Sequence, residues 1–189
     1  FDNSQDDPEI FLNSSVSLPA GARLEFRGKG TVTFADGISI NGTGGTASYF
    51  SLKDSAVLQL ATGSSTIKGK INVVVENEAE INVDTDQQLF IGESTNNVIN
   101  FTVGLGGRVR VEAMTDADVI ASTTPLRKAK LSLHKATSTL SINSNSSLYI
   151  GNGGAFEINA NSNVSTGGDL QSFVVGKNSE LYIDNGGVL

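Results

Sequence analysis

The sequence repeats a short motif in which two apolar residues flank one other residue, and successive copies begin about eight residues apart. We call this motif the apolar triplet. Near the N-terminus, Val16-x-Leu18, Leu24-x-Phe26 and Val32-x-Phe34 follow one another at this spacing. Further copies are Val73-x-Val75, Ile81-x-Val83, Leu89-x-Ile91, Leu140-x-Ile142, Leu148-x-Ile150, Phe156-x-Ile158, Phe173-x-Val175 and Leu181-x-Ile183. A repeat of this kind indicates a fold built from stacked units.

An apolar triplet is a three-residue strand with both apolar side chains on one face, because successive side chains of an extended chain point to opposite sides. It cannot bury itself, but a coil whose turns stack supplies an identical neighbour at about 4.8 Å. If three triplets form one turn, the sequence should match itself at a shift of about 24 residues. Leu140 maps to Val164 at 24, and Leu24 to Phe50 at 26. The sequence therefore predicts an all-β fold: a right-handed, single-stranded parallel β-helix, or β-solenoid, with three strands per turn of about 24 residues.

The repeat covers most of the 189 residues and predicts one domain, 1–189. Residues 1–12 are expected to cap one end of the stack, where an uncovered turn would expose unpaired backbone groups. Residues 113–130 break the period and are interpreted as a loop excursion from the coil. The chain begins without Met and stops within a repeat, so we expect it to be a segment of a longer surface protein.

Composition excludes several kinds of chemistry. The chain has no Cys, so it has no disulfide scaffold, thiolate metal site or Cys nucleophile. His134 is its only histidine, which rules out a His pair as metal ligands within the chain. The net charge of −7 argues against nucleic-acid binding, and no apolar stretch approaches the roughly 20 residues of a membrane span. We expect no cofactor, no metal, no nucleic-acid partner and no insertion into a membrane.

Two C-terminal stretches carry a resemblance to a known family. LYIGNGGAFEINANSNVS (148–165) and FVVGKNSELYIDNGGVL (173–189) are similar in style to the pectate-lyase-like adhesive domains of Gram-positive cell-surface proteins. They also resemble the binding regions of serine-rich-repeat adhesins from lactobacilli. The resemblance implies a noncatalytic module, displayed outside a bacterial cell, that binds host or matrix glycans or glycoproteins through a side face of the coil.

A search for catalytic residues finds one candidate set. On this scaffold, a lyase needs clustered carboxylates that hold calcium beside a basic residue, and a hydrolase needs two carboxylates at a set separation. Asp84 and Asp86 precede Arg108 and Arg110 by about one turn. The alternative is a ladder of exposed ion pairs, and we expect no catalytic residue. In the excursion, Asp116-x-Asp118 could bind calcium, but solvated loop acids explain it as well.

The strongest candidate for binding is a basic cluster at the end of the excursion. Arg127, Lys128, Lys130 and Lys135 lie within nine positions of an otherwise acidic chain, and the pair Arg108 and Arg110 could extend the patch. Such a cluster suits an acidic polysaccharide, because Lys and Arg bind carboxylate and sulfate groups well. The alternative is a solvated loop that keeps the protein soluble.

The middle residues of the triplets should point to solvent. They are Ser17, Glu25, Thr33, Gln59, Asn82, Arg110, Ser141, Tyr149, Glu157 and Tyr182. Tyr149 and Tyr182 could stack on sugar rings. The apolar middle residues Val74, Phe90 and Val174 are expected to be covered by other groups.

These observations favour a bacterial cell-surface adhesin domain that binds glycans. Two alternatives remain open at this stage: a polysaccharide-active enzyme of the lyase type, and a structural stalk without a ligand of its own.

Overall fold

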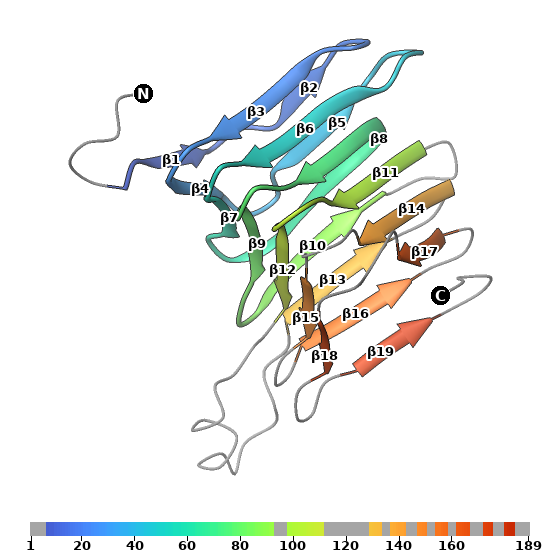
Figure 1. Cartoon of the computed structure of the whole chain (residues 1–189). Helices are drawn as coiled ribbons and strands as arrows, with labels where there is room; N and C mark the ends of the chain where they lie inside the picture. The colour runs from blue at the N-terminus through green and yellow to red at the C-terminus, as the bar shows by residue number, and fades with distance from the viewer. Residues whose placement is uncertain are drawn as a thin grey trace.

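The computed structural model of the chain is an all-β coil of parallel strands, and it confirms the predicted β-solenoid (Figure 1). It describes the backbone of residues 7–92, 98–111, 129–133, 137–142, 147–150, 154–158, 162–166, 172–175 and 180–183. Side chains are described for residues 7–92, 100–111, 129–131 and 148–150. No helix occurs within these ranges. The right-handed sense of the coil stays a prediction.

Three faces, A, B and C, follow one another along each turn. Face A contains β1 (Glu9–Leu12), β4 (Gly30–Phe34), β7 (Ala56–Leu60), β9 (Glu80–Val83), β12 (Arg108–Val111), β15 (Ser147–Ile150) and β18 (Ser172–Val175). Face B contains β2 (Val16–Leu18), β5 (Ser39–Gly42), β10 (Gln87–Ile91), β13 (Ala129–Leu133), β16 (Gly154–Ile158) and β19 (Glu180–Ile183). Face C contains β3 (Arg23–Arg27), β6 (Ser48–Lys53), β11 (Val98–Val103), β14 (Thr137–Ile142) and β17 (Ser162–Thr166). The long strand β8 (Gly63–Val75) runs through both B and C.

β8 turns the corner between faces B and C without a loop, and Gly69 makes this turn. Its φ of +86° is a conformation that side-chain-bearing residues rarely adopt. A Cβ at this position would lie 2.1 Å from the carbonyl oxygen of Gly42 in the preceding turn. The close approach of the two backbones therefore requires glycine.

The register between strands confirms the shifts expected from the sequence. Leu24 pairs with Phe50, and Leu140 with Val164.

The excursion predicted for residues 113–130 ends earlier than expected, because Ala129 and Lys130 already belong to β13. They continue face B, where β13 is paired with β10, so the period resumes earlier than expected. Residues 9–12 of the predicted cap form β1, which pairs with β4 as an edge strand of face A.

The core is the column of inward-facing triplet residues along the inside of the coil. Val73, Val75, Ile81 and Val83 are completely buried, as the alternation predicts. The ring of Phe50 packs on Phe26 of the paired strand β3 and on Phe34 of face A, with centroid distances of 6.1 and 6.0 Å. Stacked apolar side chains remove each strand's inner face from water, which is the main source of stability for a repeat fold.

The outward orientation of the middle residues is confirmed for most of those with described side chains. Ser17, Glu25 and Arg110 are at least partly exposed, and Gln59, Asn82 and Tyr149 are half-buried. Val74 and Phe90, which the sequence predicts to be covered by other groups, are half-buried. The side chains of Ser141, Glu157, Val174 and Tyr182 lie outside the described set.

The prediction is wrong for Thr33, which is only 3% exposed. Its neighbours in register are Phe11 and Gln59, and both are longer than threonine. Gln59 Nε2 also donates a hydrogen bond of 3.3 Å to Thr33 Oγ1. A short side chain between two long ones is covered by them, although it stands on the outer face.

Candidate functional site

The outward-facing residues of face A form two parallel columns along the coil. The Arg110 column consists of Gln59, Asn82, Arg110 and Tyr149, which are backbone partners in four successive strands. The Arg108 column beside it contains Val57, Glu80 and Arg108 in register. Adjacent members of a column are about 4.8 Å apart at the backbone. Parallel stacking therefore brings together side chains that are distant in sequence.

Arg110 and Tyr149 interact within their column. The Arg110 guanidinium carbon lies 5.8 Å from the centre of the Tyr149 ring, within the range of a cation–π interaction. One face of the ring is thus directed at Arg110, and a sugar could not stack on that face. The opposite ring face, the edge and the hydroxyl of Tyr149 remain for a ligand, and the sugar stacking expected for this residue stays a prediction.

Arg108 lies opposite Glu80, and this pairing corrects the candidate catalytic set. The predicted neighbours were Asp84 and Asp86, but β12 pairs with Glu80–Val83, so this turn is longer than the average repeat. Arg110 accordingly lies opposite Asn82. Asp84 follows the end of β9 and is not a backbone partner of either arginine. Glu80 and Arg108 thus place opposite charges on adjacent strands of the Arg108 column.

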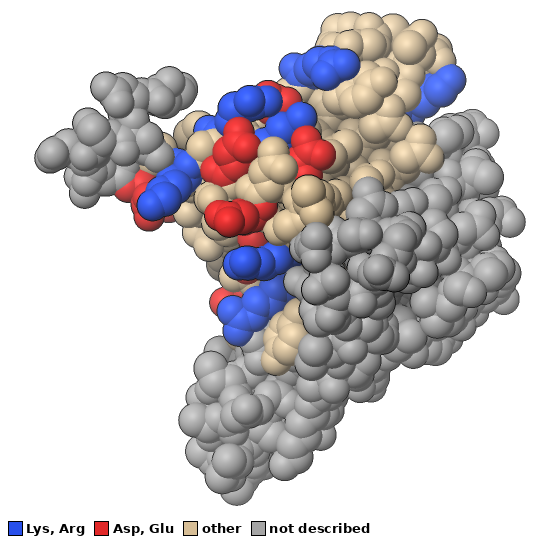
Figure 2. Space-filling model, viewed as in Figure 1, with Lys and Arg blue, Asp and Glu red and all other residues tan. Residues whose placement is uncertain are grey.

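A network of ion pairs follows the corner between faces C and A. We call Glu25, Arg27, Lys53, Asp54 and Glu76 the corner cluster. Lys53 Nζ lies 2.8 Å from Glu76 and 3.6 Å from Glu25, and Arg27 contacts Glu25 at 3.1 Å and Asp54 at 3.4 Å. Figure 2 shows acidic and basic side chains interspersed in this region. The cluster links three successive turns and is a structural feature.

The ion pairs shift the protonation of two members of the corner cluster. The hydrogen bond to Glu76 raises the pKa of Lys53 and outweighs partial burial, which lowers it. Partial burial raises the pKa of Glu25, but the charges of Lys53 and Arg27 together with hydrogen bonds outweigh it, so the pKa is lowered overall. Both shifts favour the charged forms.

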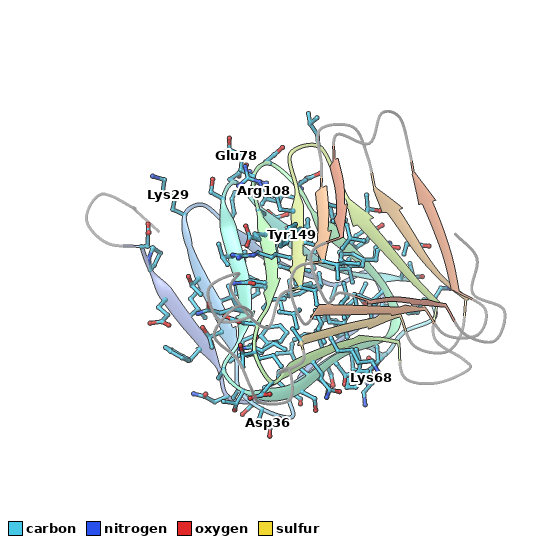
Figure 3. All side chains as sticks on the ribbon, turned by 90° about the horizontal axis from the view of Figure 1, so that it is seen from below. Lys29, Asp36, Lys68, Glu78, Arg108 and Tyr149 are labelled. Carbon is cyan, nitrogen blue, oxygen red and sulfur yellow. The ribbon has the colours of Figure 1, made fainter. Side chains whose placement is uncertain are left out.

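The structure divides the residues of the predicted binding patch between two faces. Arg108, Arg110 and Tyr149 are on face A, whereas Lys130 is on β13 of face B, in register with Gln88. Figure 3 shows Arg108 and Tyr149 on one side of the coil and Lys68, a face B residue, on the opposite side. The two arginines therefore do not extend a patch that contains Lys130. Arg127, Lys128 and Lys135 lie outside the described residues.

Tyr182 also lies on a different face from Tyr149. Its strand, β19, pairs with β16 on face B, and Tyr182 is the backbone partner of Glu157. Along the chain, Tyr182 follows Tyr149 by one full turn and one additional strand, which places the two rings one face apart. They cannot contribute to one site on a flat face.

Other possible sites in the described structure do not include the residues of the two columns. Within the described ranges, no three Asp, Glu, His or Cys side chains gather closely enough to hold a metal ion. Asp116 and Asp118 lie outside those ranges. A cavity of about 220 Å3 near the N-terminal end is lined partly by the apolar residues Ile10, Phe26 and Val32. Its lining includes none of the predicted site residues.

No family model, curated protein or solved structure matches this chain. In the part of the chain that the structure describes, no helix has the length and apolar character needed to cross a membrane. The fold therefore defines the class of protein, which is a β-solenoid. The candidate site is defined by the geometry of face A.

Sequence reasoning did not assign Gln59, Asn82 and Glu80 to a site. Gln59 and Asn82 were expected to point outward, but not to share a column with Arg110. Counting back one average turn from Arg110 leads to Asp86. The true neighbour is Asn82, because this turn is longer than the average repeat. The columns became visible only with the strand register.

Proposed function

We propose that this chain is a noncatalytic, extracellular adhesive domain that binds host or matrix glycans or glycoproteins through face A. One observation carries the proposal: Gln59, Asn82, Arg110 and Tyr149 stand in register on four consecutive strands of one face. Together they present amide, guanidinium and phenol groups in a line. Sugars offer hydroxyl and carbonyl groups that such donors and acceptors recognise.

The chemistry of the column favours binding over catalysis. The amides of Gln59 and Asn82 do not titrate, and arginine stays protonated at physiological pH. The two amides can orient a ligand but cannot act as a general acid or base, and the column contains no carboxylate that could hold calcium beside Arg110. Because the site is an open face, we expect micromolar or weaker affinity per domain, with multivalent display supplying the avidity of an adhesin.

The proposal is tested by glycan-array binding of the intact chain and of face variants. Arg110→Gln and Asn82→Ala should each weaken binding to the glycans that the parent chain retains. Arg23→Gln is a matched control, because Arg23 lies over the ring of Tyr49 at 4.5 Å on face C and repeats the Arg–Tyr arrangement away from face A. Equal loss in the control would show that face A is not the site.

The same preparation separates the other two functions. Release of unsaturated or reducing products from polygalacturonate would indicate an enzyme and overturn the proposal. An array without any bound glycan would favour a structural stalk. Retained binding to glycans without turnover is the result that the adhesive function requires.

A further inference from the structure

The two columns of face A differ in how their charges are arranged. In the Arg108 column, Arg108 is the backbone partner of Glu80, so opposite charges are adjacent. In the Arg110 column, Arg110 is flanked by Asn82 on one side and Tyr149 on the other, and both are uncharged. The next position beyond Asn82 is Gln59, also neutral. The column thus places one positive charge within a row of neutral hydrogen-bonding groups.

This row has a direction and a length. Four residues separated by three strand spacings extend over about 14 Å along the coil, at about 4.8 Å per step. A ligand that contacts all four must therefore run across the strands, parallel to the coil axis. An unbranched polymer with repeating units matches such a row of regularly spaced groups better than a compact ligand does.

Acidic residues beside the row disfavour a ligand with many negative charges. Glu80 is in the adjacent column, on the same strand as Asn82, and Glu78 lies on the same side of the coil as Arg108 and Tyr149 (Figure 3). The whole chain carries a net charge of −7. A carboxylate placed opposite Asn82 would be close to Glu80, and like charges at short range are repelled.

Resting on the proposed function, we propose that the Arg110 column selects a linear glycan in which an acidic sugar is flanked by neutral sugars. The acidic group binds the Arg110 guanidinium, which can form two parallel hydrogen bonds to a carboxylate. Tyr149 limits the orientations of that guanidinium through the cation–π contact. Asn82 and Gln59 bind the hydroxyl groups of the neutral sugars that follow. Glu80 acts as a specificity residue that repels a second acidic sugar.

The test compares three hexasaccharides by isothermal titration calorimetry at constant ionic strength. One alternates glucuronic acid with N-acetylglucosamine, one is galacturonic acid throughout, and one is neutral N-acetylglucosamine throughout. The alternating oligosaccharide should bind best, about fivefold or more above the other two. Arg110→Gln should reduce its affinity by about the same factor, fivefold or more, to the level of the neutral oligosaccharide. Arg23→Gln on face C should leave all three affinities unchanged.

Glu80→Gln provides the sharpest measurement. It should raise the affinity for the all-acidic oligosaccharide several-fold while changing that for the neutral one less than about twofold. Tightest binding of the all-acidic or of the neutral oligosaccharide by the parent chain, or no gain in Glu80→Gln, would overturn the selectivity. In that event, an array signal that still depends on Arg110 and Asn82 would leave the glycan-binding function standing. If neither the array nor calorimetry detects binding, both proposals are wrong.

Discussion

Gln87 Nε2 donates a hydrogen bond of 2.7 Å to the carbonyl oxygen of Leu60, which joins one turn of the coil to the next at a buried corner. Gln87 Oε1 accepts a second hydrogen bond, of 2.8 Å, from the backbone nitrogen of Asp84. Ser48 and Ser65 have the same role at other corners, where their hydroxyls bond to carbonyls of the preceding turn. Gln87, Ser48 and Ser65 thus bind backbone carbonyls at the corners and link successive turns.

The first prediction concerns this corner. Gln87→Met should lower the free energy of unfolding by about 1–3 kcal/mol, because a carbonyl and an amide lose their partners in a buried position. Gln88→Met is the matched control, since Gln88 is exposed, and it should change stability by less than about 0.5 kcal/mol. Urea denaturation followed by circular dichroism measures both. Equal effects would show that the corner bonds add little.

The second prediction tests the turn at Gly69. Gly69→Ala should destabilise the coil by about 1–3 kcal/mol or more, because the new Cβ meets the Gly42 carbonyl and the backbone has a positive φ. Gly45→Ala should be nearly neutral, since a Cβ there has no heavy atom within 4 Å. Thermal melts of the two variants check this. A neutral Gly69→Ala would mean that β8 turns in another way.

The third prediction separates the inner and outer faces of β9. Ile81→Ala should cost about 2–5 kcal/mol, because Ile81 is fully buried among the stacked strands and its truncation leaves a cavity. Asn82→Ala, one residue later on the outer face, should leave the melting temperature nearly unchanged while it weakens glycan binding. Melting and binding measured on the same preparations check both halves. A large loss of stability in Asn82→Ala would undermine its use as a binding variant.

The fourth prediction concerns the pH dependence of stability. The lowered pKa of Glu25 means that its contribution is present above its unfolded-state pKa of about 4.5 and is lost as pH falls through the folded value. The raised pKa of Lys53 means that its contribution is present below about 10.5 and is lost as pH rises through its folded value. Stability should therefore be greatest between these limits.

The variant Lys53→Met tests both the acid and the alkaline decline of stability. It should flatten the alkaline decline of the melting temperature and also weaken the acid decline, because Glu25 loses a neighbouring cation. High salt should reduce the difference from the parent chain, since the pairs are partly exposed. The measurement is a series of melts across pH. If the melting temperature of the variant declined at acid and alkaline pH as that of the parent chain does, the corner cluster would not control the pH response.

The fold could be predicted because every turn repeats the same local information. The period-two alternation assigns Ile81 and Val83 to the inside, and the self-similarity between turns places Leu24 beside Phe50. Neither inference needs knowledge of the loops, because insertions at the corners leave the stacked strands in register.

The sequence by itself thus determined the β-solenoid, its inward-facing residues and most of its outward-facing ones. Only the tertiary structure decided which outward residues share a face. Arg110 is opposite Asn82 because that turn is longer than the average repeat. Lys130 belongs to a different face because its strand, β13, pairs with β10 of face B. The orientation of Arg110 over Tyr149 likewise depends on contacts between turns. The physical reason is that corner lengths set the pairing of distant residues, whereas side-chain alternation is a local property of each strand.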